Sequence, residues 1–301
     1  MTAQLVTRRL DVPGGNLFYE VRGSGPLLLV IGQPMTSGPF APLADLLAAE
    51  HTVVTYDPHG LGLSTVDDES LDVTPEIEAD DLAHLLDALG GGPADVFGSS
   101  GGAVAGLAFA TRYPDRVGTL VAHEPPVTEL LPDAAPVRAA IDRVEDAYRA
   151  GGSAAAWAAF VSLVVHNGPV TEAGVPPTSW PPPGRGDAAE SDEAGSGAED
   201  RGSGEPPPAP SAKAEADGAL FFLRMLKPFT RYRPDIAALR SGAPRVLIGL
   251  GATSRQELAP RSAVALAERL GTPPVVFPGD HAGFMADPSG FADTLRRALG
   301  S

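Results

Sequence analysis

The chain contains no cysteine among its 301 residues. Disulfide bonds, thiolate metal sites and a cysteine nucleophile are therefore excluded, which agrees with a reducing compartment. Any covalent chemistry has to use serine, threonine, aspartate, lysine or histidine. Six histidines are present as possible general bases: His51, His59, His84, His123, His166 and His281.

Positive charge is also scarce, since 22 Lys and Arg residues stand against 38 Asp and Glu, for a net charge of −16. We expect no nucleic-acid partner, because phosphates would be repelled and no basic run offsets the deficit locally. Long apolar runs are missing too: residues 27–31 are far too few to cross a bilayer, and the start "MTAQLVTRRLDVPGG" lacks the apolar core of a signal peptide. We expect a cytoplasmic protein that binds no membrane.

The sequence does contain short apolar runs that alternate with helical patterns. Apolar runs lie at 26–32, 51–57, 94–98, 117–124, 245–250 and 274–279. This alternation is typical of βαβ crossovers, and it predicts an α/β fold with a mostly parallel sheet flanked by helices. Two earlier runs, near 5–12 and 16–21, are joined by Pro-Gly-Gly and predict an antiparallel hairpin at the sheet edge. We expect the core to comprise residues 1–125 and 236–301.

Residues 126–235 interrupt the strand pattern and predict an inserted helical cap. Segments 136–166 and 217–229 have apolar residues at helical spacing, Trp157 and Phe221 among them. These two aromatic residues, together with Phe160, Phe222 and Phe229, are candidates for an apolar substrate-binding wall, or alternatively for plain core. Between the two segments, from about 170 to 213, the chain is rich in Pro, Gly, Ser and acidic residues, and this composition predicts a disordered linker.

The stretch "VFGSSGGAV" at 96–104 falls between an apolar run and a helical pattern. Gly-x-Ser-x-Gly spacing fits it once, with Ser100 at the centre, because a turn centred on Ser99 would carry the bulky Phe97 two positions earlier. Such a sharp turn exposes the central hydroxyl and points the N–H groups of the following helix at the same spot. Ser100 is the candidate nucleophile, with a Gly/Ser turn that serves only packing as the alternative.

Three further stretches resemble the α/β-hydrolase superfamily: "VIGQPMTSGPF" at 30–40, "TYDPHGLGLS" at 55–64 and "VVFPGDHAGF" at 275–284. The resemblance covers roughly residues 15–125 and 240–300. It implies that the backbone N–H groups of Gln33 and Gly101 form an oxyanion hole. It also implies that His281, which follows the last strand, is the catalytic base that a serine nucleophile requires.

The resemblance also implies a third catalytic residue, an acid that orients the base and completes a triad with Ser100 and His281. Most of the superfamily has this acid after strand 7, but "GLGATSRQE" at 249–257 has Thr253 and Ser254 there. The branch typified by haloalkane dehalogenases places the acid after strand 6, where this chain has Glu124. Glu124 is therefore our first candidate. Glu257 and a site without any carboxylate remain as alternatives.

Taken together, the residues predict a serine hydrolase that cleaves an ester or related acyl bond of a small molecule through an acyl-enzyme. No cofactor and no metal are expected. His59 and His123 follow predicted strands, at the edge where ligands bind in open α/β sheets, and are candidates for substrate contacts. The alternative is a receptor, pseudo-enzyme or lyase on the same fold, because fold alone does not decide activity.

Overall fold

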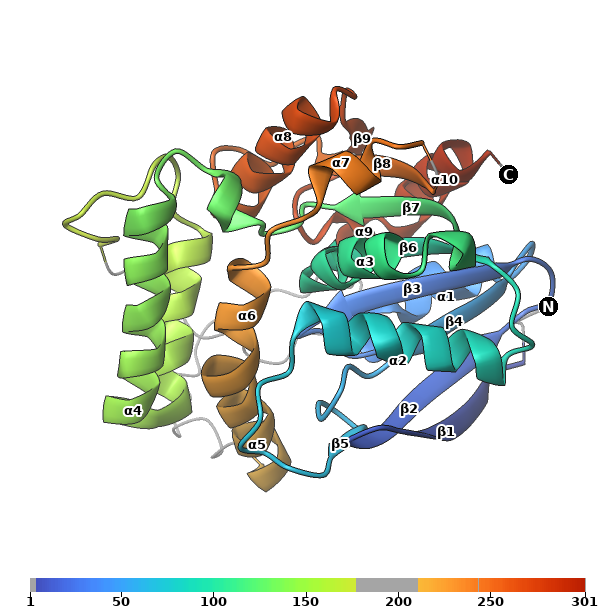
Figure 1. The fold of residues 1–301 in the computed structure, drawn as a ribbon, viewed down its shortest axis with the longest axis horizontal. Coiled ribbons are helices and arrows are strands. Elements are labelled where there is room, and N and C mark those ends of the chain that lie inside the picture. The colour runs from blue at the N-terminus through green and yellow to red at the C-terminus, as the bar shows by residue number, and fades with distance from the viewer. Residues whose placement is uncertain (1–3, 177–210, 243, 301) are drawn as a thin grey trace, which may run out of the picture.

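The computed structural model describes residues 4–176, 211–242 and 244–300 (Figure 1). The strands in these residues form one nine-stranded sheet in the order β1-β2-β4-β3-β6-β7-β8-β9, with β5 paired to β2. The strands are β1 Val6–Val12, β2 Gly15–Arg22, β3 Leu27–Gln33, β4 Thr52–Tyr56, β5 Thr65–Val66, β6 Ala94–Ser100, β7 Val117–His123, β8 Arg245–Gly251 and β9 Val275–Phe277. The helices are α1 Ala41–Leu47, α2 Pro75–Ala88, α3 Gly101–Arg112, α4 Ala134–Val164, α5 Ala212–Leu220, α6 Leu226–Thr230, α7 Ile236–Leu239, α8 Leu258–Leu270, α9 Gly283–Ala286 and α10 Pro288–Leu299.

Every neighbouring pair from β4 to β9 is parallel, whereas β1, β2 and β4 pair antiparallel. The predicted hairpin at the edge is therefore confirmed, and so is the mostly parallel α/β sheet. A parallel sheet brings the carboxyl ends of its strands to one edge, and in Figure 1 the arrowheads of β3 and β7 point toward α4 and α6. Loops that leave these strand ends are thus brought together on the side of the sheet that faces α4 and α6.

Strand side chains alternate between two cores because successive residues point to opposite faces of a sheet. Leu29 and Ile31 of β3 pack into the larger cluster with α2 and α3, while Leu28 and Val30 pack into the second cluster with α1 and α10. Helices consequently cover both faces, as Figure 1 shows. A sheet buried on both faces explains why its strands read as continuous apolar runs rather than as alternating ones.

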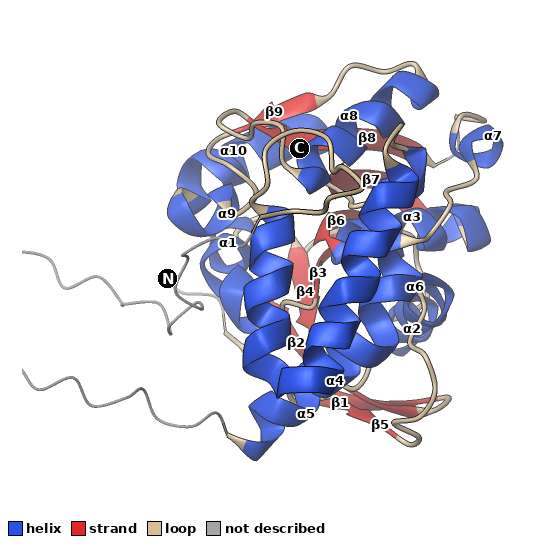
Figure 2. Ribbon diagram, turned by 90° about the vertical axis from the view of Figure 1, so that its left-hand side faces the viewer, coloured by secondary structure: helices blue, strands red, loops and turns tan. Residues whose placement is uncertain are grey.

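The inserted segment forms the helices that stand over the strand ends. Helix α4 is interrupted at Gly152, whose φ of 71° and ψ of −164° are not helical, so its two halves run as separate rods (Figure 2). Helix α5 continues through a π-helical turn, Phe221–Met225, into α6. The ring of Trp157 in α4 stacks on Phe221 at 5.8 Å between centroids. Aromatic packing therefore holds the two inserted segments together.

The predicted disordered linker, about 170–213, needs correction at both ends. Val170 is buried because its side chain packs against the hydrophobic core. Its N–H also donates to the carboxylate of Asp133 at 2.7 Å. At the other end, Ser211 caps α5 by accepting from the N–H of Ala214. Residues 177–210, which carry most of the prediction, lie outside the described residues.

Candidate active site

The chain turns sharply at Ser100, between β6 and α3. Ser100 has φ 56° and ψ −124°, a conformation that only over-determined positions adopt. A Cβ at Gly98 would meet the carbonyl oxygen of Gly102 at 2.6 Å, and one at Gly102 would meet that of Ile31 at 2.4 Å. The small residues around Ser100 are therefore required by the close approach of the strand and the helix. The neighbouring Ser99 is fully buried beneath the turn.

Ser100 and His281 line the same cavity, which has a volume of about 440 Å³. Ser100 reaches it from the end of β6, whereas His281 reaches it from the loop between β9 and α9. A concave, mostly apolar site with a few converging polar groups is the usual form of a small-molecule site. The described structure thus brings the two expected catalytic side chains to one place.

Glu124 lies behind His281 and is completely buried. Its Oε2 atom is 2.7 Å from Nδ1 of His281, and its Oε1 atom accepts from the N–H of Gly251 at 2.9 Å. Burial alone would raise the pKa of Glu124, but the hydrogen bond and the charge of His281 outweigh it and lower the pKa to about 2. The carboxylate is therefore ionised at neutral pH. Because it binds Nδ1 of His281, it orients the ring so that Nε2 points away from Glu124.

The local backbone at Glu124 is also unusual. Its φ of 47° lies in the left-handed region, and its N–H donates to the carbonyl of Gly249 in the neighbouring strand β8. A non-glycine residue persists in this region only where its surroundings require it. The turn after β7 thus aims the carboxylate at the loop that carries His281.

The expected oxyanion donors lie beside Ser100. Gln33 ends β3 and pairs in register with Ser100, and Gly101 begins α3. A Cβ at Gly101 would meet Oε1 of Gln33 at 2.2 Å, so the β3 loop and the α3 N-terminus are in close contact. Both residues line the cavity. Free N–H groups of a helix N-terminus favour an anion at this position.

Asp57 fixes the loop that follows Gln33, a role that sequence reasoning missed. Its Oδ1 atom accepts from the N–H of Ser37 at 2.8 Å and from the Ser37 hydroxyl at 2.7 Å. Its Oδ2 atom accepts from the N–H of Leu63 at 2.8 Å. The aspartate in "TYDPHGLGLS" was the available signal, but only the fold shows that it braces the loop that follows Gln33.

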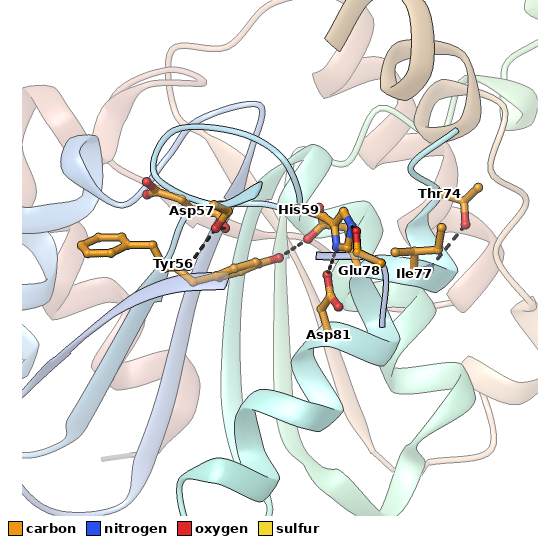
Figure 3. A network of polar contacts seen from close by, with 10 residues as sticks. Tyr56, Asp57, His59, Thr74, Ile77, Glu78 and Asp81 are labelled. Carbon is orange, nitrogen blue, oxygen red and sulfur yellow. Dashed lines mark hydrogen bonds and ion pairs between the residues drawn. The ribbon is translucent and has the colours of Figure 1, made fainter. Parts of the chain in front are cut away.

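His59 does not lie at the cavity, although the sequence suggested a substrate contact. Its Nδ1 atom is 2.8 Å from Asp81 (Figure 3). Its Nε2 atom is 3.2 Å from the carbonyl of Gly14. Glu78 accepts from the backbone N–H of His59 and from the hydroxyl of Tyr56. The loop after β4 folds the imidazole down onto α2 instead of up toward the cap, so both ring nitrogens are already engaged within the protein.

His123 does not reach the cavity either. It is fully buried at the end of β7, and its ring packs at 6.2 Å from that of His281 and at 5.4 Å from that of Phe291. Burial lowers the pKa of His123 to about 4. The imidazole of His123 is therefore neutral at neutral pH. It packs against the ring of His281 and has no exposed surface that a substrate could contact.

Trp157 and Phe221 do line the cavity, as expected for a substrate-binding wall. Of the other three aromatic candidates, Phe160 and Phe229 line the cavity too, whereas Phe222 is fully buried and does not belong to the lining. The aliphatic part of the wall was not predicted, because helical spacing alone cannot separate a pocket wall from core. Further apolar lining residues come from α4, α6 and α8: Ile141, Leu163, Val164, Leu226 and Leu258. Glu257, the alternative triad acid, lines the cavity as well but does not contact His281 in the way that Glu124 does.

In the described part of the chain, no three His, Asp or Glu side chains gather in a way that could hold a metal ion. Nor does any helix of that part combine the length and the apolar character needed to cross a bilayer.

Comparison with known proteins identifies the fold family. A family model described as "alpha/beta hydrolase fold" matches residues 25–198, which is more than half of the chain. The "Uncharacterized hydrolase YraK" of Bacillus subtilis is 42% identical over 123 residues, which cover 40% of this chain and 45% of that protein. The 2-(acetamidomethylene)succinate hydrolase of Mesorhizobium japonicum is 35% identical over 118 residues, 39% of this chain and 42% of that protein. The aligned part thus spans less than half the length of these relatives.

Among solved structures, a thermophilic esterase from Thermogutta terrifontis, with malate bound, superposes with a TM-score of 0.65. The superposition covers 99% of this chain and 98% of the esterase at 21% sequence identity. At this identity the likeness shows the fold alone, because one fold serves many reactions.

Proposed function

Because the chain belongs to the alpha/beta hydrolase fold family, we propose that it is a serine hydrolase of small molecules. Ser100 is the nucleophile, His281 the general base and Glu124 the residue that orients the base. The bond cleaved is an ester or a related acyl bond. We further propose that the enzyme acts in the cytoplasm, and that residues 126–235 form a cap on a core of residues 1–125 and 236–301.

In the first half of the reaction, the hydroxyl oxygen of Ser100 attacks the acyl carbon of the substrate. The Nε2 atom of His281 takes the hydroxyl proton, and Glu124 stabilises the resulting imidazolium through Nδ1. The negative charge that develops on the acyl oxygen is held by the N–H groups of Gln33 and Gly101. Collapse of this intermediate expels the leaving group, which receives the proton from His281.

The second half releases the acid. Water gives a proton to His281 and attacks the acyl carbon, and the bond to Ser100 then breaks with return of the proton to the serine oxygen. One set of residues thus serves both halves, and no metal or cofactor is needed for either.

The observation that carries this proposal is the joint placement of Ser100 and His281 on one cavity with Glu124 bonded to Nδ1 of His281. Three chain segments far apart in sequence supply these groups. Two of the three, Ser100 and Glu124, have positive φ values although neither is glycine. Such strain is costly and clusters at functional sites.

The test is to treat the protein with a fluorophosphonate probe, which modifies only activated serines, and to map the site of modification. We expect labelling at Ser100, loss of labelling and turnover in Ser100→Ala, and retention of both in Ser99→Ala, which removes a hydroxyl that lies buried beneath the turn. Absence of labelling from the parent would favour a receptor or pseudo-enzyme on this fold. Equal loss of labelling in both variants at unchanged thermal stability would overturn the assignment of Ser100 as the nucleophile.

A further inference from the structure

We propose that the active-site cavity selects substrates whose acyl group is apolar and carries no carboxylate. Esters with a neutral acyl chain are the preferred class, and esters with a cationic chain are accepted better than their anionic counterparts. This inference rests on the proposed hydrolase function and narrows it to a substrate class.

The wall opposite the catalytic groups is aromatic. The Trp157 ring packs edge-on against Phe160 at 5.7 Å and stacks on Phe221 at 5.8 Å, and all three side chains line the cavity. Because these rings also pack against one another, the wall is rigid and offers no charged partner to a ligand. An apolar acyl chain gains from leaving water here, whereas a carboxylate would lose its hydration without compensation.

The charges that do line the cavity are negative. Glu257 and Asp280 belong to the lining, and none of the described lining residues is Lys or Arg. Neither carboxylate takes part in an ion pair within the described residues. Among the described residues, the carboxylate of Glu257 accepts a hydrogen bond only from the N–H of Arg255, and that of Asp280 only from the N–H of Ala282. A second carboxylate brought by the substrate would therefore face like charges with no cation to offset them.

The nearby cations are committed elsewhere or lie outside the cavity. The guanidinium of Arg261, one turn along α8, binds Asp133 and the carbonyl of Gly168. Arg255 is exposed and does not belong to the lining. Among the described residues, Arg261 is thus already paired, and Arg255 contributes no group to the lining of the cavity.

The first turn of α8 also forms part of the cavity wall, and a helix N-terminus by itself favours an anion. Here the position before the helix is occupied by Glu257, whose own carboxylate makes no capping hydrogen bond to the helix. Pro260 lacks an N–H and removes one of the donors that the turn would otherwise offer. The partial positive charge at the N-terminus of α8 is thus offset in part by the carboxylate of Glu257. The N-terminus therefore does not provide a site for a substrate anion.

The remaining polar lining groups, Gln33, Thr230 and Ser254, are neutral. The Gln33 side chain is only 2% exposed and lies against Gly101 at the oxyanion loop. Such groups can hydrogen-bond a neutral carbonyl or ether oxygen. The cavity therefore differs in chemistry from what a succinate derivative, the substrate class named for one relative, would require.

The test compares three p-nitrophenyl esters of matched length: the neutral hexanoate, the adipate half-ester and the 6-trimethylammoniohexanoate. We expect kcat/KM for the hexanoate to exceed that for the adipate half-ester by at least about tenfold. The cationic ester should lie between the two. Added salt should narrow the gap, because the charges sit near solvent.

The variant Glu257→Gln removes one of the two charges and keeps the shape. It should reduce the hexanoate-to-adipate ratio by about three- to tenfold. Glu268→Gln is the matched control, since Glu268 is exposed and lies about 15 Å further along the same helix. This control should leave the ratio unchanged.

The inference is overturned if kcat/KM for the adipate half-ester lies within about twofold of that for the hexanoate. It is also overturned if Glu257→Gln and Glu268→Gln change the hexanoate-to-adipate ratio equally. Failure of the proposed function is distinguishable, because then no ester is cleaved and the fluorophosphonate does not label Ser100. In that case calorimetric titration of Ser100→Ala with the same esters still measures the charge preference. Tighter binding of the hexanoate than of the adipate half-ester supports it, and equal or reversed affinities contradict it.

Discussion

Nδ1 of His281 lies 2.7 Å from Oε2 of Glu124, although 157 positions separate the two residues in the chain. The contact joins the turn after β7 to the loop after β9, across the carboxyl end of β8. The N–H of Gly251, at the end of β8, donates to the other carboxylate oxygen, so the strand between the two also holds the acid in place. The pair is therefore built by three adjacent strand ends rather than by either residue's neighbours in sequence.

We predict that Glu124→Gln lowers kcat by about 10²–10⁴ without displacing Ser100 or His281, because an amide favours the wrong imidazole tautomer. Steady-state kinetics on a neutral ester measures the effect, and circular dichroism checks the fold. The same exchange at Glu257, which does not contact His281, should cost far less. A Glu124→Gln enzyme nearly as active as the parent would remove Glu124 from the triad.

A rescue experiment tests the same pair from the other side. Ser254 lies where most of the superfamily carries its acid, and it lines the cavity beside His281. We expect Ser254→Asp in the Glu124→Gln background to restore part of the lost kcat, because it supplies a second carboxylate for Nδ1. Ser254→Asn in the same background is the control, and equal activity of the two double variants would argue against an orienting acid.

Asp57 offers a prediction about the oxyanion loop. Asp57→Asn keeps the shape but weakens charge-assisted hydrogen bonds from Ser37 and Leu63, each worth about 1.5–3 kcal/mol. Since the loop carries the Gln33 donor, kcat should fall by about tenfold or more, with a smaller change in KM. Asp45→Asn, at an exposed carboxylate that pairs with Arg22 and not with Ser37 or Leu63, is the control. An unchanged kcat together with a lowered melting temperature would restrict Asp57 to a structural role.

The cluster of Glu78, His59 and Asp81 predicts that stability falls as pH rises. Burial, with the charge of Asp81, raises the pKa of Glu78 to about 7. The folded protein therefore holds a proton that the unfolded chain has released above about pH 4.5, and it loses this advantage as pH rises through 7. Glu78→Gln should flatten this part of the profile. Melting temperatures at pH 5 and pH 8 measure it, and parallel profiles for parent and variant would contradict it.

His123 acts in the opposite direction, because burial lowers its pKa to about 4. Below pH 6.5 the unfolded chain takes up a proton that the folded protein refuses, so stability is lost as pH falls toward 4. Between pH 7 and pH 5 this loss is about 2 kcal/mol. We predict that His123→Phe, which suits the surrounding rings, removes most of this difference in chemical denaturation. An equal difference in parent and variant would show that His123 does not titrate in this way.

The fold, and the chain order of the proposed catalytic groups, could be predicted from the sequence. Strand runs, helix spacing and the glycines around Ser100 are local signals, because backbone geometry and close packing restrict which residues fit. The α/β sheet, its hairpin edge and the position of the sharp turn follow from them. The composition of residues 170–213 also predicted a disordered linker. Val170, at its first position, is buried, which shows that composition averaged over a segment does not locate the segment's boundary.

Tertiary structure decided which of the candidate polar residues meet. His59 and His123 follow strands just as Glu124 does, and no local pattern separates them. The loop after β4 turns His59 onto Asp81, and His123, the last residue of β7, is buried among aromatic rings. The left-handed turn at Glu124, in contrast, aims its carboxylate at His281. Likewise, the packing of α8 determines that Glu257 lines the cavity and that Arg261 forms an ion pair with Asp133. A polar side chain's role depends on partners distant in sequence, and these exist only once the strands are in order.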